Sequence, residues 1–231
     1  MNETTVEYRQ QRFAAPPGAT DILLIRHGES QAARPGESFP LVNGQGDPAL
    51  HPNGEAQAER LGERLAAAPI TAIYATSLRR TQQTAAPLAK RLNLSPVIEP
   101  DLREVHLGSW EGGLFRQKSH EQDPVYLRMH EEERWDVIPG AESHAALTAR
   151  INPALNRIAA AHRNELIAVV VHGGVIAHIL AQAASARPFA FVGADNGSIS
   201  RLIIHDDRWL VRGFNDAAHL AEVVSTNQGL S

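Results

Sequence analysis

Two histidines stand at matching places in the sequence, each at the end of a short apolar run. His27 follows the run 21–25 with Arg26 between them, and His172 directly follows the run 166–171. Such runs are typical of strands buried on both faces, and open α/β sheets bind ligands at the carboxyl ends of their strands. A neutral imidazole there can attack an electrophile or donate a hydrogen bond. One such histidine would be interpreted as merely closing a strand, whereas two, both followed by glycine, indicate a shared crevice.

Predicted strands and helices alternate around these two histidines. Apolar runs predict strands at 21–25, 70–75, 97–98, 166–171, 198–205 and 209–214. Amphipathic periodicity predicts helices at 54–68, 78–92, 143–162 and 175–184. Pro87 should kink the second helix or force a local adjustment, and Pro153 argues against an unbroken third one. The alternation predicts an α/β fold: a three-layer α/β/α sandwich, with a mostly parallel central sheet and helices on both faces.

Polar and turn-forming stretches predict one domain between two tails. Residues 1–20 are polar and end in two prolines and a glycine, which indicates a flexible N-terminal tail. We expect a single domain over 21–216 and a C-terminal tail over 217–231, where no periodicity remains. Within the domain, the charged segment at about 112–142 is interpreted as a helical insertion. Three of its aromatic residues could line an apolar substrate pocket, although packing onto the core is favoured: Phe115, Tyr126 and Trp135.

The composition excludes several kinds of site and disfavours several partners. The 231 residues carry a net charge of −4, whereas nucleic acids and anionic membranes attract basic surfaces. Cysteine is absent, so disulfides, thiolate metal sites and cysteine nucleophiles are excluded. No apolar run approaches the roughly 20 residues that span a bilayer, and the first residues do not resemble a secretory signal. We therefore expect a cytoplasmic protein with no nucleic-acid or membrane partner. A homodimer would fit such a fold, although no sequence feature establishes one.

Four blocks of the sequence resemble, in order, the signature of the histidine phosphatase superfamily, which includes the cofactor-dependent phosphoglycerate mutases. The blocks are LIRHGES (24–30), YATSLRRTQQTA (74–85), LREVHLGSWEG (102–112) and VVHGGVI (170–176). Weaker similarities occur at 47–50, 140–143 and 196–198. The RHG triplet alone would be weak evidence. Four ordered blocks that span roughly 21–214, each with the required residue types, make the resemblance strong.

The resemblance implies a phosphoryl transfer that needs no metal ion and no cofactor. His27 would be the nucleophile and would form a phosphohistidine intermediate. Glu104 would protonate the leaving alcohol and then deprotonate the attacking water. Arg26, Arg80 and His172 would complete the catalytic set by donating hydrogen bonds to the phosphoryl oxygens. Positioned donors would thus take the place of a metal ion, and the blocks supply no carboxylate-rich magnesium site.

Three positions within or near these blocks require a choice. Arg80 aligns with the phosphate-binding arginine of the second block, whereas Arg79 would project about 100° away on a helix and is interpreted as a solvated residue. Ser30 is placed with the phosphate-binding residues, although it could also cap the segment that follows it. Many family members have a phosphate-holding asparagine where this chain has Ala33. Either another group replaces that asparagine, or the pocket makes one contact fewer.

Three functions fit these residues. Hydrolysis of a small phosphorylated metabolite is favoured, because the insertion is modest and net acidic. A phosphoglycerate mutase is the alternative, and it would have to exclude water from the phosphohistidine with a longer insertion. A non-catalytic module that binds phosphorylated ligands is disfavoured, because such a protein would be expected to have lost part of the catalytic set. Specificity lies in loops, so the sequence is compatible with sugar phosphates, phosphoglycerates, nucleotides and phosphoproteins.

Overall fold

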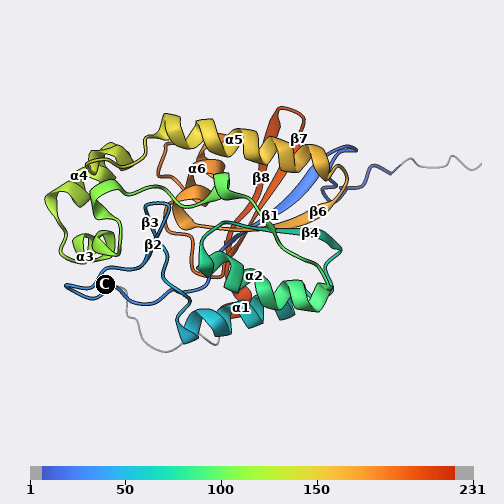
Figure 1. Ribbon diagram of the computed structural model, residues 1–231. Coiled ribbons are helices and arrows are strands. Elements are labelled where there is room, and N and C mark those ends of the chain that lie inside the picture. Colours follow the sequence, from blue (N-terminus) through green and yellow to red (C-terminus); the bar gives the residue numbers. More distant parts are fainter. Residues whose placement is uncertain (1–6, 222–231) are drawn as a thin grey trace, which may run out of the picture.

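The computed structural model describes residues 7–221 and is centred on a twisted sheet of six strands (Figure 1). Its spatial order is β5-β4-β6-β1-β7-β8. The strands are β1 (Thr20–Arg26), β4 (Ile70–Ala75), β5 (Val97–Ile98), β6 (Leu166–Val171), β7 (Ile199–His205) and β8 (Arg208–Asp216). The first four of these pair in parallel, whereas β7 and β8 are antiparallel. The mostly parallel sheet predicted from the sequence is therefore confirmed. A separate small ribbon pairs β2 (Leu41–Val42) with β3 (Gln45–Gly46).

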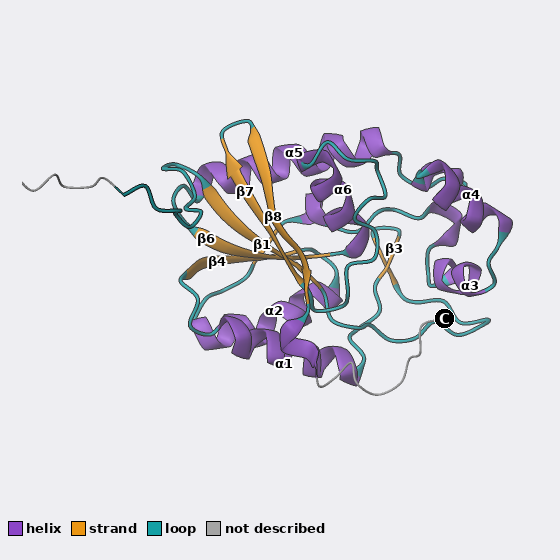
Figure 2. Cartoon of the chain, turned by 180° about the vertical axis from the view of Figure 1, so that it is seen from behind, coloured by secondary structure: helices purple, strands orange, loops and turns teal. Residues whose placement is uncertain are grey.

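Helices cover both faces of the sheet (Figure 2). One face carries α1 (Pro52–Leu65) and α2 (Arg79–Leu92), and the other carries α5 (His144–Ala161) and α6 (Gly173–Ala183). Successive side chains of a strand point to opposite faces, so β1 feeds two apolar clusters. Ile22 and Leu24 pack with residues of α5 and α6, while Leu23 and Ile25 pack with residues of α1 and α2. The three-layer α/β/α sandwich is confirmed.

Two helices contain a proline in their interior and are nevertheless continuous. Pro87 lies within α2, and Pro153 lies within α5, which runs unbroken over 18 residues. The interruption of α5 that Pro153 suggested is therefore wrong. A proline in a helix interior costs about 3 kcal/mol or more. Both helices bury an apolar stripe against the sheet, including Leu88 in α2 and Leu155 in α5, and this burial offsets that cost.

The insertion forms two short helices beyond the carboxyl edge of the sheet (Figures 1 and 2). They are α3 (Leu114–His120) and α4 (Pro124–Glu132), preceded by the 3-10 turns η1 (Pro100–Leu102) and η2 (Gly108–Trp110) and followed by η3 (Trp135–Val137). The ring of Phe115 lies 6.2 Å from that of Trp110, 6.1 Å from that of Trp135 and 5.9 Å from that of Tyr126, centroid to centroid. These aromatic side chains pack the insertion onto the core, as favoured.

The boundary expected for the C-terminal tail requires a correction. The chain forms a further 3-10 turn, η4 (Ala218–Leu220), and Leu220 is only 1% exposed. Packing against the domain therefore continues past residue 216, because η4 lies against α1. The remaining parts of the two predicted tails, 1–6 and 222–231, lie outside the described residues. Residues 7–19 form neither helix nor strand.

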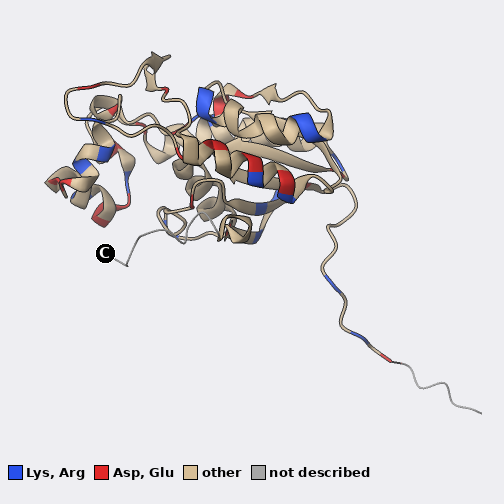
Figure 3. Ribbon diagram, turned by 90° about the horizontal axis from the view of Figure 1, so that it is seen from below, with Lys and Arg blue, Asp and Glu red and all other residues tan. Residues whose placement is uncertain are grey.

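The surface of the described chain mixes charges of both signs. Figure 3 shows basic and acidic residues interspersed along the helices. Within residues 7–221, no helix combines the length and the apolar character that crossing a membrane requires.

Candidate active site

His27 lies where β1 ends, at the carboxyl edge of the sheet, and is 5% exposed. Its Nδ1 lies 2.7 Å from the Gly28 carbonyl oxygen. A carbonyl only accepts, so Nδ1 carries the proton and Nε2 keeps its lone pair. The Arg80 Nε–H donates to this Nε2 at 3.1 Å. Burial, followed by the positive charges of Arg80 and Arg26, holds the pKa of His27 well below its ordinary value, so the ring is neutral.

Close contact between β1 and α1 fixes the backbone around His27. A Cβ on Gly28 would lie 2.5 Å from the Gly54 carbonyl oxygen, and one on Gly54 would lie 2.0 Å from the Glu29 carbonyl oxygen. Only glycine at both positions permits this approach. The Gly28 N–H also donates to the Thr84 hydroxyl of α2 at 2.9 Å. The residue after the nucleophile candidate is therefore held by two helices.

The structure separates the two adjacent arginines of the second block as the sequence predicted. Arg80 is 7% exposed and also donates to the Gly46 carbonyl at 2.9 Å. Arg79 is half-exposed and pairs with Asp47 at 3.5 Å, away from His27. The one-residue step around the first turn of α2 thus places Arg80 inside the pocket and Arg79 at the surface.

His172 follows β6 and is the N-cap residue of α6. Because β1 and β6 are neighbours, its ring lies 5.2 Å from that of His27, centroid to centroid. Its Nε2 bonds with the Thr76 hydroxyl at 3.0 Å, while its Nδ1 is buried without a hydrogen-bond partner. Burial, followed by the charge of Arg80, holds the pKa of His172 well below its ordinary value. The convergence of the two imidazoles expected from the sequence is therefore present.

Glu104 and Arg26 complete the predicted set from two further segments. Glu104 lies between η1 and η2, and its carboxylate accepts from the Val105 N–H at 2.9 Å and from the Gly174 N–H at 3.4 Å. Arg26 ends β1 and donates to the Ala194 carbonyl, while its Nε is buried without a hydrogen-bond partner. Both side chains face the space in front of His27.

All of these residues except the fully buried His172 line one pocket of about 250 Å³. Its polar wall includes four of the predicted site residues: Arg26, His27, Arg80 and Glu104. Its apolar wall is formed by aromatic residues: Phe39, Trp110, Phe115 and Trp135. Phe115 and Trp135 of the insertion thus both pack against the core and line the pocket. No group of three or more histidine, aspartate or glutamate side chains suited to a metal ion occurs in the part of the chain that the structure describes.

Arg116 of α3 also lines this pocket and was not among the predicted site residues. Its Nη2 donates to the Ser30 hydroxyl and its Nη1 to the Gln31 carbonyl, each at 2.7 Å. Burial and the neighbouring charge of Arg26 lower its pKa. Ser30, which is 4% exposed, therefore holds an arginine beside the pocket. The sequence held one indication of a further phosphate-binding group: Ala33 stands where many family members have an asparagine.

A family model for the histidine phosphatase superfamily (branch 1) matches residues 22–217. The chain belongs to the histidine phosphatase superfamily. The resemblance drawn from the four sequence blocks is confirmed, and the enzyme class with it. Of the predicted set, Arg26, His27, Arg80 and Glu104 line one pocket, and the fully buried His172 lies beside His27.

Similar proteins include both phosphatases and proteins named as mutases. A metal-independent phosphoserine phosphatase of Arabidopsis thaliana is 33% identical over 217 residues, which are 91% of this chain and 87% of that protein. A probable phosphoglycerate mutase GpmB of Erwinia tasmaniensis is 31% identical and covers 87% of this chain and 95% of its own. The structure of a mycobacterial glucosyl-3-phosphoglycerate phosphatase aligns with a TM-score of 0.71 at 27% identity, over 85% of this chain and 99% of that one.

Proposed function

We propose that this histidine phosphatase hydrolyses small phosphomonoesters without a metal ion, through a phosphohistidine on His27. The observation that carries the proposal is the state of that ring. Its Nδ1–H donates to the Gly28 carbonyl at 2.7 Å, so the lone pair lies on Nε2, where it accepts from the Arg80 Nε–H at 3.1 Å until a phosphoryl group takes that place. A neutral nucleophile beside permanently charged donors suits attack on a phosphate dianion.

In the first step, His27 Nε2 attacks phosphorus, a P–N bond forms and the P–O bond to the alcohol breaks. Glu104 gives its proton to the departing oxygen, which leaves as the neutral alcohol. The guanidinium groups of Arg26 and Arg80 hold the phosphoryl oxygens. His172 donates from Nδ1, with the Thr76 hydroxyl donating to its Nε2.

In the second step, water attacks the phosphohistidine and the P–N bond breaks. The Glu104 carboxylate takes the proton of that water, and neutral His27 is restored as inorganic phosphate leaves. Arg116 adds a third guanidinium to the pocket. We assign it the phosphate contact for which this chain has no asparagine at position 33, and Ser30 holds it in place.

Two observations support small phosphorylated metabolites as substrates. The pocket, at about 250 Å³, has room for a metabolite beside its charged wall. Two of the relatives described above are named for phosphoserine and for glucosyl-3-phosphoglycerate. A cytoplasmic location and a homodimer stay predictions.

The alternative is a phosphoglycerate mutase, which would return the phosphoryl group to a bound glycerate instead of to water. Its support is the name of one relative described above, a probable phosphoglycerate mutase. Phosphatase names among the other relatives favour hydrolysis.

The test compares the wild type with His27→Ala in EDTA on p-nitrophenyl phosphate, phosphoserine, 3-phosphoglycerate and glycerol 3-phosphate. We expect hydrolysis by the wild type alone, and a phosphohistidine detected by mass spectrometry after alkaline quenching. Loss of activity in EDTA would overturn the metal-free mechanism. Transfer from a bisphosphate primer to 3-phosphoglycerate without hydrolysis would favour the mutase. If the wild type is inactive in every assay, a binding module becomes the better description.

A further inference from the structure

Glu104 lies in a segment that regular secondary structure does not support. Residues 103–107 connect η1 to η2. Their one β-bridge is an isolated one, between Leu107 and Ala141. A general acid must lie within hydrogen-bond reach of the leaving oxygen, so this segment needs other support. The structure supplies it from α5 and from the residues before that helix.

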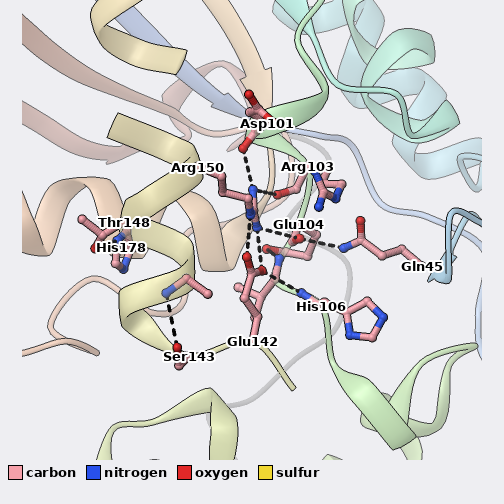
Figure 4. Close-up of polar contacts among 12 residues, drawn as sticks. Gln45, Asp101, Arg103, Glu104, His106, Glu142, Ser143, Thr148, Arg150 and His178 are labelled. Atoms are coloured by element: carbon pink, nitrogen blue, oxygen red, sulfur yellow. Dashed lines mark hydrogen bonds and ion pairs between the residues drawn. The ribbon is translucent and has the colours of Figure 1, made fainter. Parts of the chain in front are cut away.

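Arg150 of α5 donates to three backbone carbonyls around Glu104 (Figure 4). Its Nη1 donates to the Asp101 carbonyl at 2.6 Å and to the Arg103 carbonyl at 2.8 Å. Its Nη2 donates to the Glu104 carbonyl at 3.0 Å. The Gln45 amide donates to the same Glu104 carbonyl at 2.7 Å, so this oxygen is held from two sides.

Glu142 completes the arrangement and lies in the 140–143 segment that resembles the family pattern only weakly. Its carboxylate accepts from Arg150 Nε at 2.7 Å and from Arg150 Nη2 at 2.9 Å, a two-pronged ion pair. It also accepts from the His106 N–H at 3.2 Å. The side chains of Glu142 and Arg150 are 13% and 10% exposed. Burial alone would raise the pKa of Glu142, but its bonds to Arg150 hold that pKa below the ordinary value.

We propose that the ion pair of Arg150 and Glu142 positions Glu104 for proton transfer to the leaving group. The pair fixes the backbone on both sides of Glu104, through the carbonyls of residues 101, 103 and 104 and the N–H of residue 106. Neither side chain lines the pocket, so both are positioning residues and touch no substrate. The inference rests on the proposed acid role of Glu104.

Arg157 offers a matched control on the same helix. It lies seven residues, about two turns, after Arg150 and pairs with Glu99 and Asp101 at 3.1 Å each. Its side chain is 56% exposed, and its bonds go to carboxylates instead of to backbone carbonyls. Arg157→Met thus removes an ion pair between α5 and the same loop without freeing the backbone at Glu104.

The experiment measures kcat/KM for phenyl phosphate and p-nitrophenyl phosphate. The two esters are similar in size, but phenolate needs a proton from the enzyme far more than nitrophenolate does. The value of kcat/KM reports the transfer of the phosphoryl group to His27, a step that comes before water takes part. For Arg150→Met we expect a loss of roughly 10- to 100-fold on phenyl phosphate and less than about 3-fold on p-nitrophenyl phosphate. Arg157→Met should change both by less than about 2-fold.

Two further variants guard against misfolding and a general structural effect. Arg150→Met leaves a buried carboxylate unpaired and can prevent folding. The double variant Arg150→Met, Glu142→Leu removes both charges, and it should show the same selective loss while retaining a folded circular dichroism spectrum. Adding Arg150→Met to Glu104→Gln should leave the ratio of the two substrates unchanged, because the acid is already absent.

Equal losses on both substrates in the folded double variant would overturn the positioning role. So would a further selective loss when Arg150→Met is added to Glu104→Gln. If Glu104→Gln itself shows no preference between the two esters, or the wild type hydrolyses neither, the proposed function fails and the positioning role falls with it. If Glu104→Gln loses more kcat/KM on phenyl phosphate than on p-nitrophenyl phosphate, but the Arg150 variants lose equally on both, only the positioning role is overturned and the proposed function stands.

Discussion

The two groups proposed to act on either side of the phosphoryl group are held by different kinds of structure. His27 continues the sheet: its N–H donates to the Val171 carbonyl at 3.0 Å, and its carbonyl accepts from the Gly197 N–H at 3.3 Å. Glu104 lies between two 3-10 turns, and its segment is held by three side chains: Gln45, Glu142 and Arg150. The proposed nucleophile is thus held by backbone hydrogen bonds, and the segment of the proposed acid is held by side-chain hydrogen bonds.

This difference determines how each side responds to substitution. A backbone ladder tolerates most side-chain replacements and fails chiefly where a new atom collides with the main chain. A side-chain network loses its function when one partner is removed. Substitutions that disturb the His27 side, meaning His27 and the backbone around it, should lower the rate for every substrate. Substitutions that disturb the Glu104 side, meaning Glu104 and the side chains that hold its segment, should lower the rate by an amount that depends on the leaving group.

The largest expected effect comes from removing the acid itself. Glu104→Gln should lower kcat/KM for phenyl phosphate by about 1000-fold and for p-nitrophenyl phosphate by less than about 10-fold, because only the poorer leaving group needs the proton. Steady-state kinetics on the two esters measure both values. Equal losses on the two substrates would show that Glu104 does not act as the acid.

Gly28→Ala should break the nucleophile side. The new methyl group would meet the Gly54 carbonyl oxygen at 2.5 Å, which forces β1 and α1 apart. We expect roughly 100-fold lower kcat/KM on both esters and a loss of about 3 kcal/mol in unfolding free energy. Urea unfolding and kinetics measure these effects. Gly213→Ala, where nothing lies within 4 Å of the added atom, is the control. Activity within 2-fold of the wild type in Gly28→Ala would contradict the close-contact argument.

Arg116→Ala should weaken substrate binding more moderately, because two other guanidinium groups stay in the pocket. We expect KM to rise by about 10-fold on both esters, the effect of one charge-assisted hydrogen bond. Arg128→Ala is the control in the same insertion, since its side chain is 57% exposed and pairs with Glu132 at 3.7 Å. Ala33→Asn added to Arg116→Ala should recover part of the affinity. An unchanged KM in Arg116→Ala would remove it from the phosphate site.

Acid should affect the His27 side and the Glu104 side at different pH values. The pKa values of His27 and His172 are lowered in the folded protein, so the unfolded chain binds more protons as the pH falls below about 6.5. Unfolding free energy should then fall by up to about 1.4 kcal/mol per pH unit for each. The lowered pKa of Glu142 stabilises the fold above about 4.5, and that contribution is lost only at lower pH.

Urea unfolding at pH values from 7 to 3 measures both ranges. His172→Asn should flatten the curve between pH 6.5 and 5. Glu142→Gln should lower the free energy of unfolding above about pH 4.5 and should reduce the slope of the curve only below about 4.5. A curve that is flat from pH 7 to 5 in the wild type would contradict the buried neutral state of the two histidines.

Much of the frame could be predicted because its signals are local. Apolar runs predicted the strands at 70–75 and 166–171 with the observed bounds. The second and fourth blocks predicted that Arg80 and His172 lie near His27, because Arg80 begins a helix and His172 directly follows a strand. Arg80 lines the pocket, and the His172 ring lies beside that of His27. The path of α5 through Pro153 was not predictable, since its stability comes from packing against the sheet.

The sequence by itself determined the family, the α/β fold and the predicted set of site residues, because periodicity and contiguous motifs depend on neighbours along the chain. Only the tertiary structure showed that Arg116 meets Ser30 across 86 positions and that Arg150 holds Glu104 across 46. Charged residues in a polar helix have the same sequence pattern whether they face solvent or a pocket. The folding of distant segments onto one another decides between the two, because it sets which charges are buried and what they bind.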